Sequence, residues 1–299
     1  MNQDLVHQHY NDPKVQNEIV RFSQNRWVGL HCSEMDKRGR PYLIRYLGRG
    51  KQPLILREAE DIQKFLRIFN KLGPRTFYAT ANVYRELSRF EHLTDLSNIE
   101  ACTPTWDIDN VPEKWQASIK ATQEIISFLE QNGIKQSAYV VWSGRGCHVR
   151  IHEGAISIGV RKKINPLDVA YAIVEYVNAK LTAKFTDIAL EHNAENLRVD
   201  NEIDPQRLFT CPLSLHKELD RVCVCIAPDS LNQFTPDWTL PKTYKHYGAW
   251  DRHSIGEADE LAVKAFQTVG GCPSLPRFRA RKHPPLDEQI MKWLDKIRD

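Results

Sequence analysis

The sequence predicts an α+β fold in which mixed or antiparallel sheets are flanked by helices. Three observations support this prediction. Short apolar segments bounded by glycine and proline indicate strands, and segments with helical spacing of apolar residues occur among them. The predicted strands and helices do not alternate strictly along the sequence, as they would in a parallel α/β sheet. Two apolar segments also flank Ser143–Gly146, which is a hairpin pattern.

The strand predictions rest on β-branched and aromatic residues that end at turn residues. They cover the end of 13–30, then 42–47, 75–80, 104–109, 137–142, 147–152 and 222–227, with 196–200 and 207–210 flanking a short acidic turn. The helix predictions rest on apolar residues three and four apart and on glycine or proline stops. They cover the start of 13–30, then 58–72, 84–90, 114–132, 166–185, 259–268 and 287–297.

Composition and charge narrow the class of protein. The chain has 299 residues, of which 41% are hydrophobic and 26% charged, as in soluble globular proteins. No run approaches the length of a membrane span, so we expect no contact with a membrane. The N-terminus lacks a signal-peptide core, and the seven cysteines are odd in number and scattered. We therefore expect a cytoplasmic or nucleoid-associated protein without a disulfide framework.

Trp106-Asp107-Ile108-Asp109 is the first motif that carries chemistry. Side chains two apart on a strand share a face, so both carboxylates can face one divalent cation or a pair of them. Two acids on one face repel each other unless a cation or a base neutralises them. The alternative is a strand end whose aspartates cap the following turn.

Ser143-Gly144-Arg145-Gly146-Cys147-His148 is the second motif. It places a hydroxyl, a guanidinium and an imidazole around two glycines that let the backbone approach an anion closely. The arginine can grip phosphate oxygens, and the histidine can donate to them. The alternative is an ordinary glycine-rich hairpin with a surface arginine and a packed histidine. Together, an acid pair and a phosphate cradle predict metal-assisted nucleotidyl transfer.

A third group of candidates lies between residues 199 and 217. A further acid that follows an apolar residue there can complete the metal site. Ser214, His216 and Lys217 would add phosphate donors. The alternative is a polar loop with a satisfied histidine.

The order of these motifs resembles the archaeo-eukaryotic primase superfamily. The shared order is D-x-D, then S-G-x-G-x-H, then an apolar residue with Asp, then R-L-x-x-x-P-x-S-L-H. The chain is most similar to the small catalytic subunit of primases and to their primase-polymerase relatives. Residues 75–84 resemble the family's segment before the first acidic motif, so the resemblance covers residues 75–217. It implies a primase small-subunit-like catalytic core.

The resemblance implies template-directed synthesis of RNA or DNA primers from NTPs or dNTPs on single-stranded DNA. Metal ligands for Mg²⁺ or Mn²⁺ would be Asp107, Asp109 and Asp200, with Asp204 as the alternative third acid. The incoming nucleotide would be held by Ser143, Arg145, His148, Arg207, Ser214, His216 and Lys217. A primase large subunit or another replication or repair protein would be the partner.

Two spacings depart from those of the cellular small subunits. One residue fewer separates Ser143 from His148, which is the spacing of primase-polymerase relatives. The interval from Asp200 to Ser214 is also about two residues short, which keeps Asp204 open as the third acid.

The position of a lysine and the absence of a zinc-binding module also differ from the pattern of the cellular small subunits. Lys217 directly follows His216, whereas the cellular enzymes usually carry a lysine two places after that histidine. Residues 110–142 contain no cysteine or histidine, so the family's zinc module is absent. The pair Cys223 and Cys225 favours buried strand cysteines over zinc ligands, because no second pair stands at a suitable spacing.

The motifs favour a metal-dependent nucleotidyltransferase that makes primers by a two-metal mechanism. The alternative is a non-catalytic primase-like accessory subunit that binds nucleic acid. Such a subunit would be expected to have lost an acid, and this chain keeps all three. A metal-dependent nuclease would use the acid pair but not the triphosphate-binding set.

We expect residues 1–271 to form the primase/polymerase catalytic domain, with the motifs in a core at 75–230. Residues 272–286 read as a basic, proline-rich linker, and 287–299 as a terminal helix. The apolar face of that helix would either dock into a partner's groove or pack on its own domain.

Two further stretches combine basic and aromatic residues. The run from Lys37 to Lys51 either contacts phosphates or forms solvated loops. The segment 244–250, with Tyr244, His246, Tyr247 and Trp250, either lines a nucleic-acid groove or packs on the core.

Overall fold

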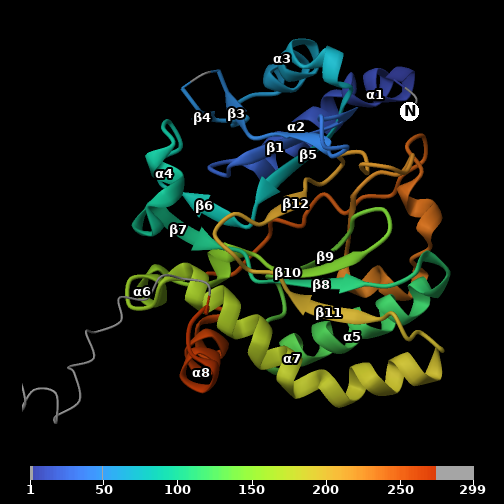
Figure 1. The fold of residues 1–299 in the computed structure, drawn as a ribbon. Helices are drawn as coiled ribbons and strands as arrows, with labels where there is room; N and C mark the ends of the chain where they lie inside the picture. The colour runs from blue at the N-terminus through green and yellow to red at the C-terminus, as the bar shows by residue number, and fades with distance from the viewer. Residues whose placement is uncertain (1–2, 49, 274–299) are drawn as a thin grey trace, which may run out of the picture.

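The computed structural model describes residues 3–48 and 50–273. Two antiparallel sheets lie one above the other, with helices above the upper sheet and below the lower one (Figure 1). The predicted α+β class with helix-flanked sheets is therefore confirmed. The terminal helix expected at 287–299 and nearly all of the expected linker lie outside the described residues.

The upper sheet has the strand order β12-β5-β1-β2, and every neighbouring pair is antiparallel. Its strands are β1 (Val28–Met35), β2 (Pro41–Ile44), β5 (Pro74–Thr80) and β12 (Leu208–Thr210). Three helices lie on its upper side in Figure 1, namely α1 (Gln3–Tyr10), α2 (Pro13–Ser23) and α3 (Glu60–Ile68).

The lower sheet has the order β11-β8-β10-β9-β13 and is also antiparallel. Its strands are β8 (Thr105–Asp109), β9 (Ala138–Trp142), β10 (Cys147–Ile151), β11 (Arg198–Asn201) and β13 (Val224–Ile226). The long helices α5 (Trp115–Gln131) and α7 (Pro166–Glu191) cover its lower face, and α8 (Asp259–Val269) packs on α7 (Figure 1).

The remaining elements are short. Two strand pairs join β3 (Tyr46–Leu47) to β4 (Gln52–Pro53), and β6 (Asn82–Tyr84) to β7 (Ile99–Cys102). The short helices are α4 (Glu91–Thr94) and α6 (Ile158–Arg161). Among the described residues, no helix is both long and apolar enough to cross a membrane.

The alternation along β8 positions the candidate site. Trp106 and Ile108 are fully buried, and they belong to the hydrophobic core that also includes the inner faces of α5 and α7. Because neighbouring residues of a strand point to opposite faces, Asp107 and Asp109 are directed away from those helices. The face that they occupy is turned toward the upper sheet.

Most predicted elements are present, but the helix predicted at 84–90 is wrong. Tyr84 belongs to strand β6 and pairs with Ile99 of β7, and the backbone N–H of Arg85 donates to the carbonyl of Asn98. The long-range partner strand thus supplies the backbone hydrogen bonds that a local helix would otherwise supply. Helix α1 and strand β7 were not expected from the sequence.

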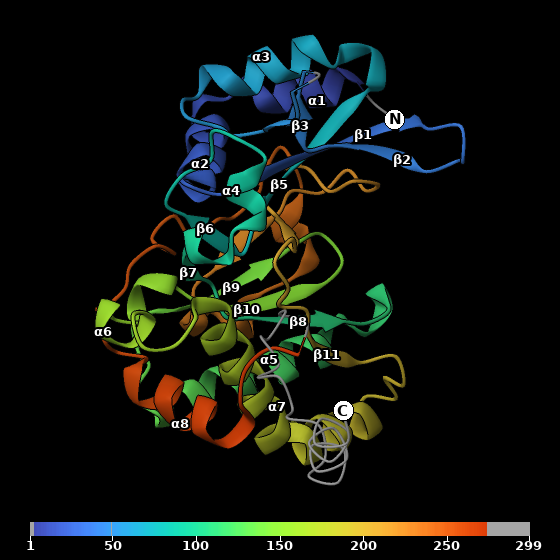
Figure 2. The ribbon, with the colours of Figure 1, turned by 60° about the vertical axis from the view of Figure 1, so that its left-hand side comes forward.

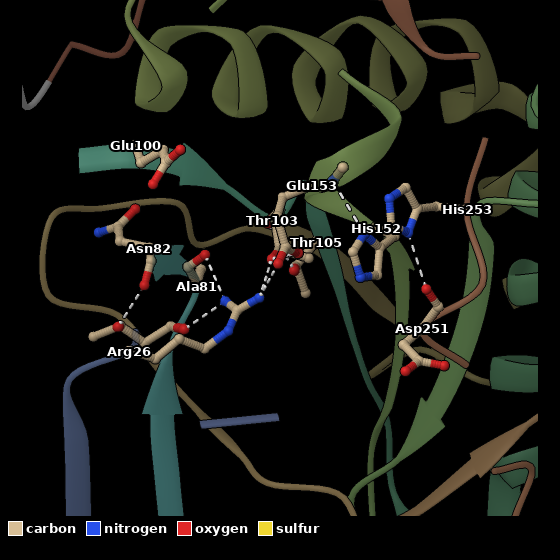
Figure 3. Close-up of polar contacts among 12 residues, drawn as sticks. Arg26, Ala81, Asn82, Glu100, Thr103, Thr105, His152, Glu153, Asp251 and His253 are labelled. Atoms are coloured by element: carbon tan, nitrogen blue, oxygen red, sulfur yellow. Dashed lines mark hydrogen bonds and ion pairs between the residues drawn. The ribbon is translucent and has the colours of Figure 1, made fainter. Parts of the chain in front are cut away.

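A buried ion pair ties the α2–β1 connection to the lower half of the molecule. The Arg26 side chain is 3% exposed, and its Nη2 lies 2.8 Å from Glu153 Oε1. The guanidinium also donates to the carbonyls of Thr80 and Ala81 and to the hydroxyl of Thr103 (Figure 3). Burial opposes ionisation of Glu153, but Arg26, His152 and the hydrogen bonds to the carboxylate together outweigh it, and the pKa of Glu153 falls to about 2.

We predict that Glu153→Gln destabilises the protein by about 3–5 kcal/mol at neutral pH, because Arg26 would keep a buried and unpaired charge. Since the pKa of Glu153 is depressed, its contribution is complete above pH ~4.5 and is lost as the pH falls toward ~2. Urea unfolding across this pH range measures both effects. Glu100→Gln, an exposed control on β7, should change the unfolding free energy by less than about 0.5 kcal/mol. Equal stability of the two variants would contradict this account.

Candidate active site

Three predicted acids meet on the upper face of the lower sheet. Asp107 and Asp109 are two residues apart on β8 and therefore share a face. Asp200 on β11 stands directly opposite Asp107 in the antiparallel register. Residues that stand opposite each other on neighbouring strands project from the same face of a sheet. The topology thus brings together carboxylates that lie far apart in the sequence.

Asp204 does not join this group through its side chain. Its carboxylate accepts the backbone N–H of Gln206 at 2.5 Å and caps the turn that follows β11. Among the neighbouring acids that raise the pKa of Asp109 is Asp200, and Asp204 is not one of them. The structure therefore places Asp200, rather than Asp204, beside the acid pair.

Asp107 is buried and engages two basic side chains. Its Oδ1 lies 3.1 Å from His148 Nε2, and its Oδ2 accepts from Arg207 Nη2 at 2.8 Å. Burial opposes ionisation of Asp107, but His148 and Arg207 outweigh it and hold the pKa of the carboxyl below its usual value. Arg207 also pairs with Glu202, so it bridges two carboxylates.

His148 lies between Asp107 and a buried arginine. Arg150 Nη2 approaches His148 Nδ1 at 3.4 Å, and a guanidinium can only donate. The hydrogen of the ring therefore resides on Nε2 and is donated to Asp107. The sequence led us to expect His148 as a phosphate donor. In this structure both of its nitrogens are engaged, and its contact is with the acid.

Asp109 and Asp200 are the exposed members of the acid group. Burial, the charge of Asp107 and that of Asp200 all raise the pKa of Asp109. The nearby Arg145 opposes this shift only in part. The negative charges of Asp107 and Asp200 therefore act on Asp109, at a position where a cation would relieve the repulsion.

The glycine-rich turn between β9 and β10 packs tightly against the acids and a histidine. Both the backbone N–H and the hydroxyl of Ser143 donate to the carbonyl of Gly146, at 2.9 and 3.1 Å. Gly144 has φ of +118°, and a Cβ there would lie 2.9 Å from the ring of His216. A Cβ at Gly146 would lie 3.0 Å from Asp109 Oδ1. Both positions need glycine for this close approach.

His216 is held as a neutral donor. Its Nδ1 accepts the backbone N–H groups of Glu218 and Leu219 at 3.1 and 3.0 Å, so the hydrogen of the ring is on Nε2. Burial and the nearby Arg145 lower the pKa of His216 to about 4. At neutral pH the ring therefore offers an uncharged N–H beside the glycine turn.

Two cations beside this turn are exposed and weakly paired. Arg145 Nη1 lies 4.0 Å from Glu218 Oε2, and Lys217 Nζ lies 3.8 Å from Glu218 Oε1. Both basic side chains are at least 40% exposed, so these ion pairs contribute little to stability. The two cations are thus available to an anionic ligand.

Ser214 is not available as the phosphate donor that the sequence suggested. It is fully buried, its hydroxyl accepts the backbone N–H of Phe77, and it shares a hydrogen bond with Tyr10. Its contacts are structural and fix the start of the loop that carries His216.

Arg75 is a site-supporting residue that the sequence reasoning missed. It is buried, and its Nε donates to the carbonyl of His216 at 2.7 Å. Its Nη2 donates to the carbonyl of Leu219 and the carboxylate of Asp220. In the sequence, the only indication of this role was the charge of Arg75 at the start of a predicted strand that carries no other charged residue.

An apolar groove lies on the face of the upper sheet that bears His31 and Tyr78, opposite to the face on which Phe77 packs against Tyr10 of α1. Its lining residues are His31, Pro41, Leu43, Tyr78, Leu208 and Lys217. Leu208 follows Arg207, and Lys217 follows His216, so the groove begins beside the candidate site. The ring of His31 meets that of Tyr78 edge-on with centroids 6.5 Å apart.

In the aromatic segment 244–250, His246 and Trp250 pack on the core, whereas Tyr244 and Tyr247 each line a surface pocket. Trp250 is 4% exposed and donates to Glu18. His246 lies between the backbone N–H of Cys225 and the same Glu18 carboxylate. Cys223 and Cys225 are buried free thiols on and beside β13.

The acid group suits a divalent cation by its chemistry. Carboxylate oxygens are the ligands that Mg²⁺ and Mn²⁺ prefer. Among the described residues, no group of three or more acidic, histidine or cysteine side chains is arranged to hold a metal ion, and both oxygens of Asp107 contact basic side chains. A cation at this position would have to share Asp107 with Arg207 or displace that arginine.

Comparisons with known proteins identify a resemblance in fold. No family model matches the chain, and no curated protein matches it. Among solved structures, it is similar to the polymerase domain of Mycobacterium tuberculosis ligase D in complex with DNA. The TM-score is 0.49, with 12% sequence identity over 90% of this chain and 90% of that chain. At this identity the likeness concerns the course of the chain alone.

We predict that Asp107→Asn lowers the pKa of Asp109 in metal-free protein. The substitution removes a neighbouring negative charge, which favours the ionised form of Asp109. Carboxyl carbon NMR over a pH series measures this pKa, and Asp204→Asn serves as the control that leaves it unchanged. An unaltered pKa in Asp107→Asn would show that the two carboxylates do not interact.

Proposed function

We propose that this protein is a metal-dependent nucleotidyltransferase that extends or initiates a nucleic-acid strand from nucleoside triphosphates on a single-stranded DNA template. The proposal rests mainly on one observation. The strand positions of Asp107, Asp109 and Asp200 lie next to the Ser143–Gly146 turn. Acids for a cation and donors for a triphosphate stand within one small region. That combination is what transfer of a nucleotide to a hydroxyl requires.

The basic residues around the glycine turn would hold the triphosphate. Arg145 and Lys217 are exposed cations with one weak carboxylate partner between them. His216 adds an uncharged N–H donor, fixed by the backbone of Glu218 and Leu219. Backbone N–H groups of the turn add further donors, because the glycines leave room for a close anion. These groups would orient the nucleotide and stabilise the charge of the leaving diphosphate.

Asp107, Asp109 and Asp200 would hold Mg²⁺ or Mn²⁺. When bound, the cation would activate the attacking hydroxyl and shield the phosphate charges. His148 would position Asp107 through its Nε2 hydrogen, while Arg150 fixes which ring nitrogen carries that hydrogen. Arg207 would neutralise Asp107 while no cation is bound.

A non-catalytic accessory subunit that binds nucleic acid is the competing proposal. It would not require the close approach of Asp109 to Gly146, nor the fixed ring of His216. Both features support an active enzyme over a binding module.

We predict that Asp200→Asn reduces nucleotide incorporation at least about 100-fold, whereas Asp204→Asn retains it. Asn keeps the shape of Asp and can cap a turn, so the control removes one negative charge of the same loop without removing the turn. The assay follows labelled nucleotides on single-stranded DNA with Mg²⁺ or Mn²⁺, with and without an annealed primer.

Each outcome of this assay is informative. Products made without a primer would establish initiation, and products that need a primer would establish extension. Loss of activity in Asp204→Asn but not in Asp200→Asn would overturn the assignment of the third acid. The absence of incorporation by the folded wild-type protein in all conditions would favour the accessory subunit.

A further inference from the structure

The β1–β2 hairpin ends in a cationic tip outside the candidate active site. Lys37, Arg38 and Arg40 are exposed there. Arg40 pairs with Asp36 at 3.1 Å, whereas Lys37 and Arg38 have no ion-pair partner among the residues described. Two unpaired positive charges on adjacent residues favour an anionic partner.

The tip is rigidly built, which distinguishes it from a solvated loop. Asp36 Oδ1 accepts the backbone N–H groups of Arg38 and Arg40 at 2.8 and 3.0 Å. The backbone N–H of Asp36 donates to the carbonyl of Arg40, and Gly39 adopts φ of +70° to close the turn. The turn therefore holds the backbone of the two cations in one arrangement, so less entropy is lost when they bind a ligand.

The apolar groove connects this tip to the candidate site. It runs from Lys217 and Leu208 past Tyr78 to Leu43 and Pro41 on β2. Leu43 is 43% exposed, which leaves an apolar surface open to solvent along this path. In Figure 2 the hairpin, the β9–β10 turn and the end of β8 point to the same side of the molecule.

The length of this path sets the size of the ligand. Gly29 stands opposite Tyr78 in the sheet, and Met35 near the tip lies six positions further along β1. At about 3.3 Å per residue, this distance is about 20 Å. A base-stacked strand, with the duplex spacing of about 3.4 Å per nucleotide, would cover this distance in about six steps.

We propose that the β1–β2 hairpin binds the phosphate backbone of the single nucleic-acid strand that enters the active site, with Lys37 and Arg38 as the contacts. This inference rests on the proposed function, since it names a second contact for the same substrate. The exposed apolar surface offers a place for bases to stack. The two adjacent cations at its end would neutralise phosphates of the same strand.

The test is binding of a fluorescently labelled DNA single strand of about 15 nucleotides, which exceeds the six steps of the path. Anisotropy is measured without divalent metal over a series of salt concentrations. The variant Lys37→Ala/Arg38→Ala should bind about 25-fold more weakly at ~0.1 M salt, and its salt slope should fall by about 1.4. Arg38→Lys keeps the charge and should retain the wild-type slope.

The matched control is Lys162→Ala/Lys163→Ala. These two lysines are exposed, adjacent and unpaired among the described residues, and they follow α6 on the opposite side of Figure 2. This control removes the same charge and should leave the salt slope unchanged. Circular dichroism confirms that all variants are folded.

Equal effects of the two double variants, or an unchanged slope in Lys37→Ala/Arg38→Ala, would overturn the proposal. Failure of the proposed function has a different signature, because it would abolish nucleotide incorporation by the wild-type protein. A folded wild-type protein that binds the strand through the hairpin without incorporating nucleotides would therefore keep the inference about the hairpin and reject the enzyme.

Discussion

The two-faced burial of strand β8 is the constraint on which the candidate site depends. Trp106 and Ile108 are fully buried with the inner faces of α5 and α7, so the strand cannot shift its register by one residue without exposing both. That anchoring fixes Asp107 and Asp109 on the other face. The antiparallel partners β10 and β11 then place His148 and Asp200 opposite Asp107. The hydrophobic core therefore sets the position of the charged site.

Charge neutralisation is the second theme of the structure. Asp107 accepts a hydrogen bond from His148 and pairs with Arg207, while burial and the charges of Asp107 and Asp200 raise the pKa of Asp109. Away from the site, Arg26 and Glu153 neutralise each other's charge. Their ion pair joins the α2–β1 connection to the segment that follows β10. The two places differ in how far the acids are paired. Glu153 has a basic partner in Arg26, whereas no ion pair with a basic side chain is found for Asp109 among the described residues.

The sequence motifs predicted much of the site, because their chemistry is carried by residue type and short spacing. The D-x-D pair, the hairpin turn and the S-L-H histidine all lie in one region, and the fold class is the predicted one. The roles of buried residues were harder to predict. Ser214 serves Tyr10 and Phe77 rather than solvent, and the rings of His246 and Trp250 pack against α2. Residue type alone does not show whether a polar side chain makes a buried structural contact or is free to bind a ligand.

The sequence by itself determined the local elements, the shared face of Asp107 and Asp109, and the glycines that permit a tight turn. Each of these follows from periodicity or from the conformational freedom of single residues. Only the tertiary structure placed Asp200, and not Asp204, opposite Asp107, because the register of β11 sets that position. It also revealed the contact of Arg75 with Asp220, 145 residues away, and the contact of Arg150 with His148. Register and long-range packing are properties of the folded chain, and no short window of the sequence contains them.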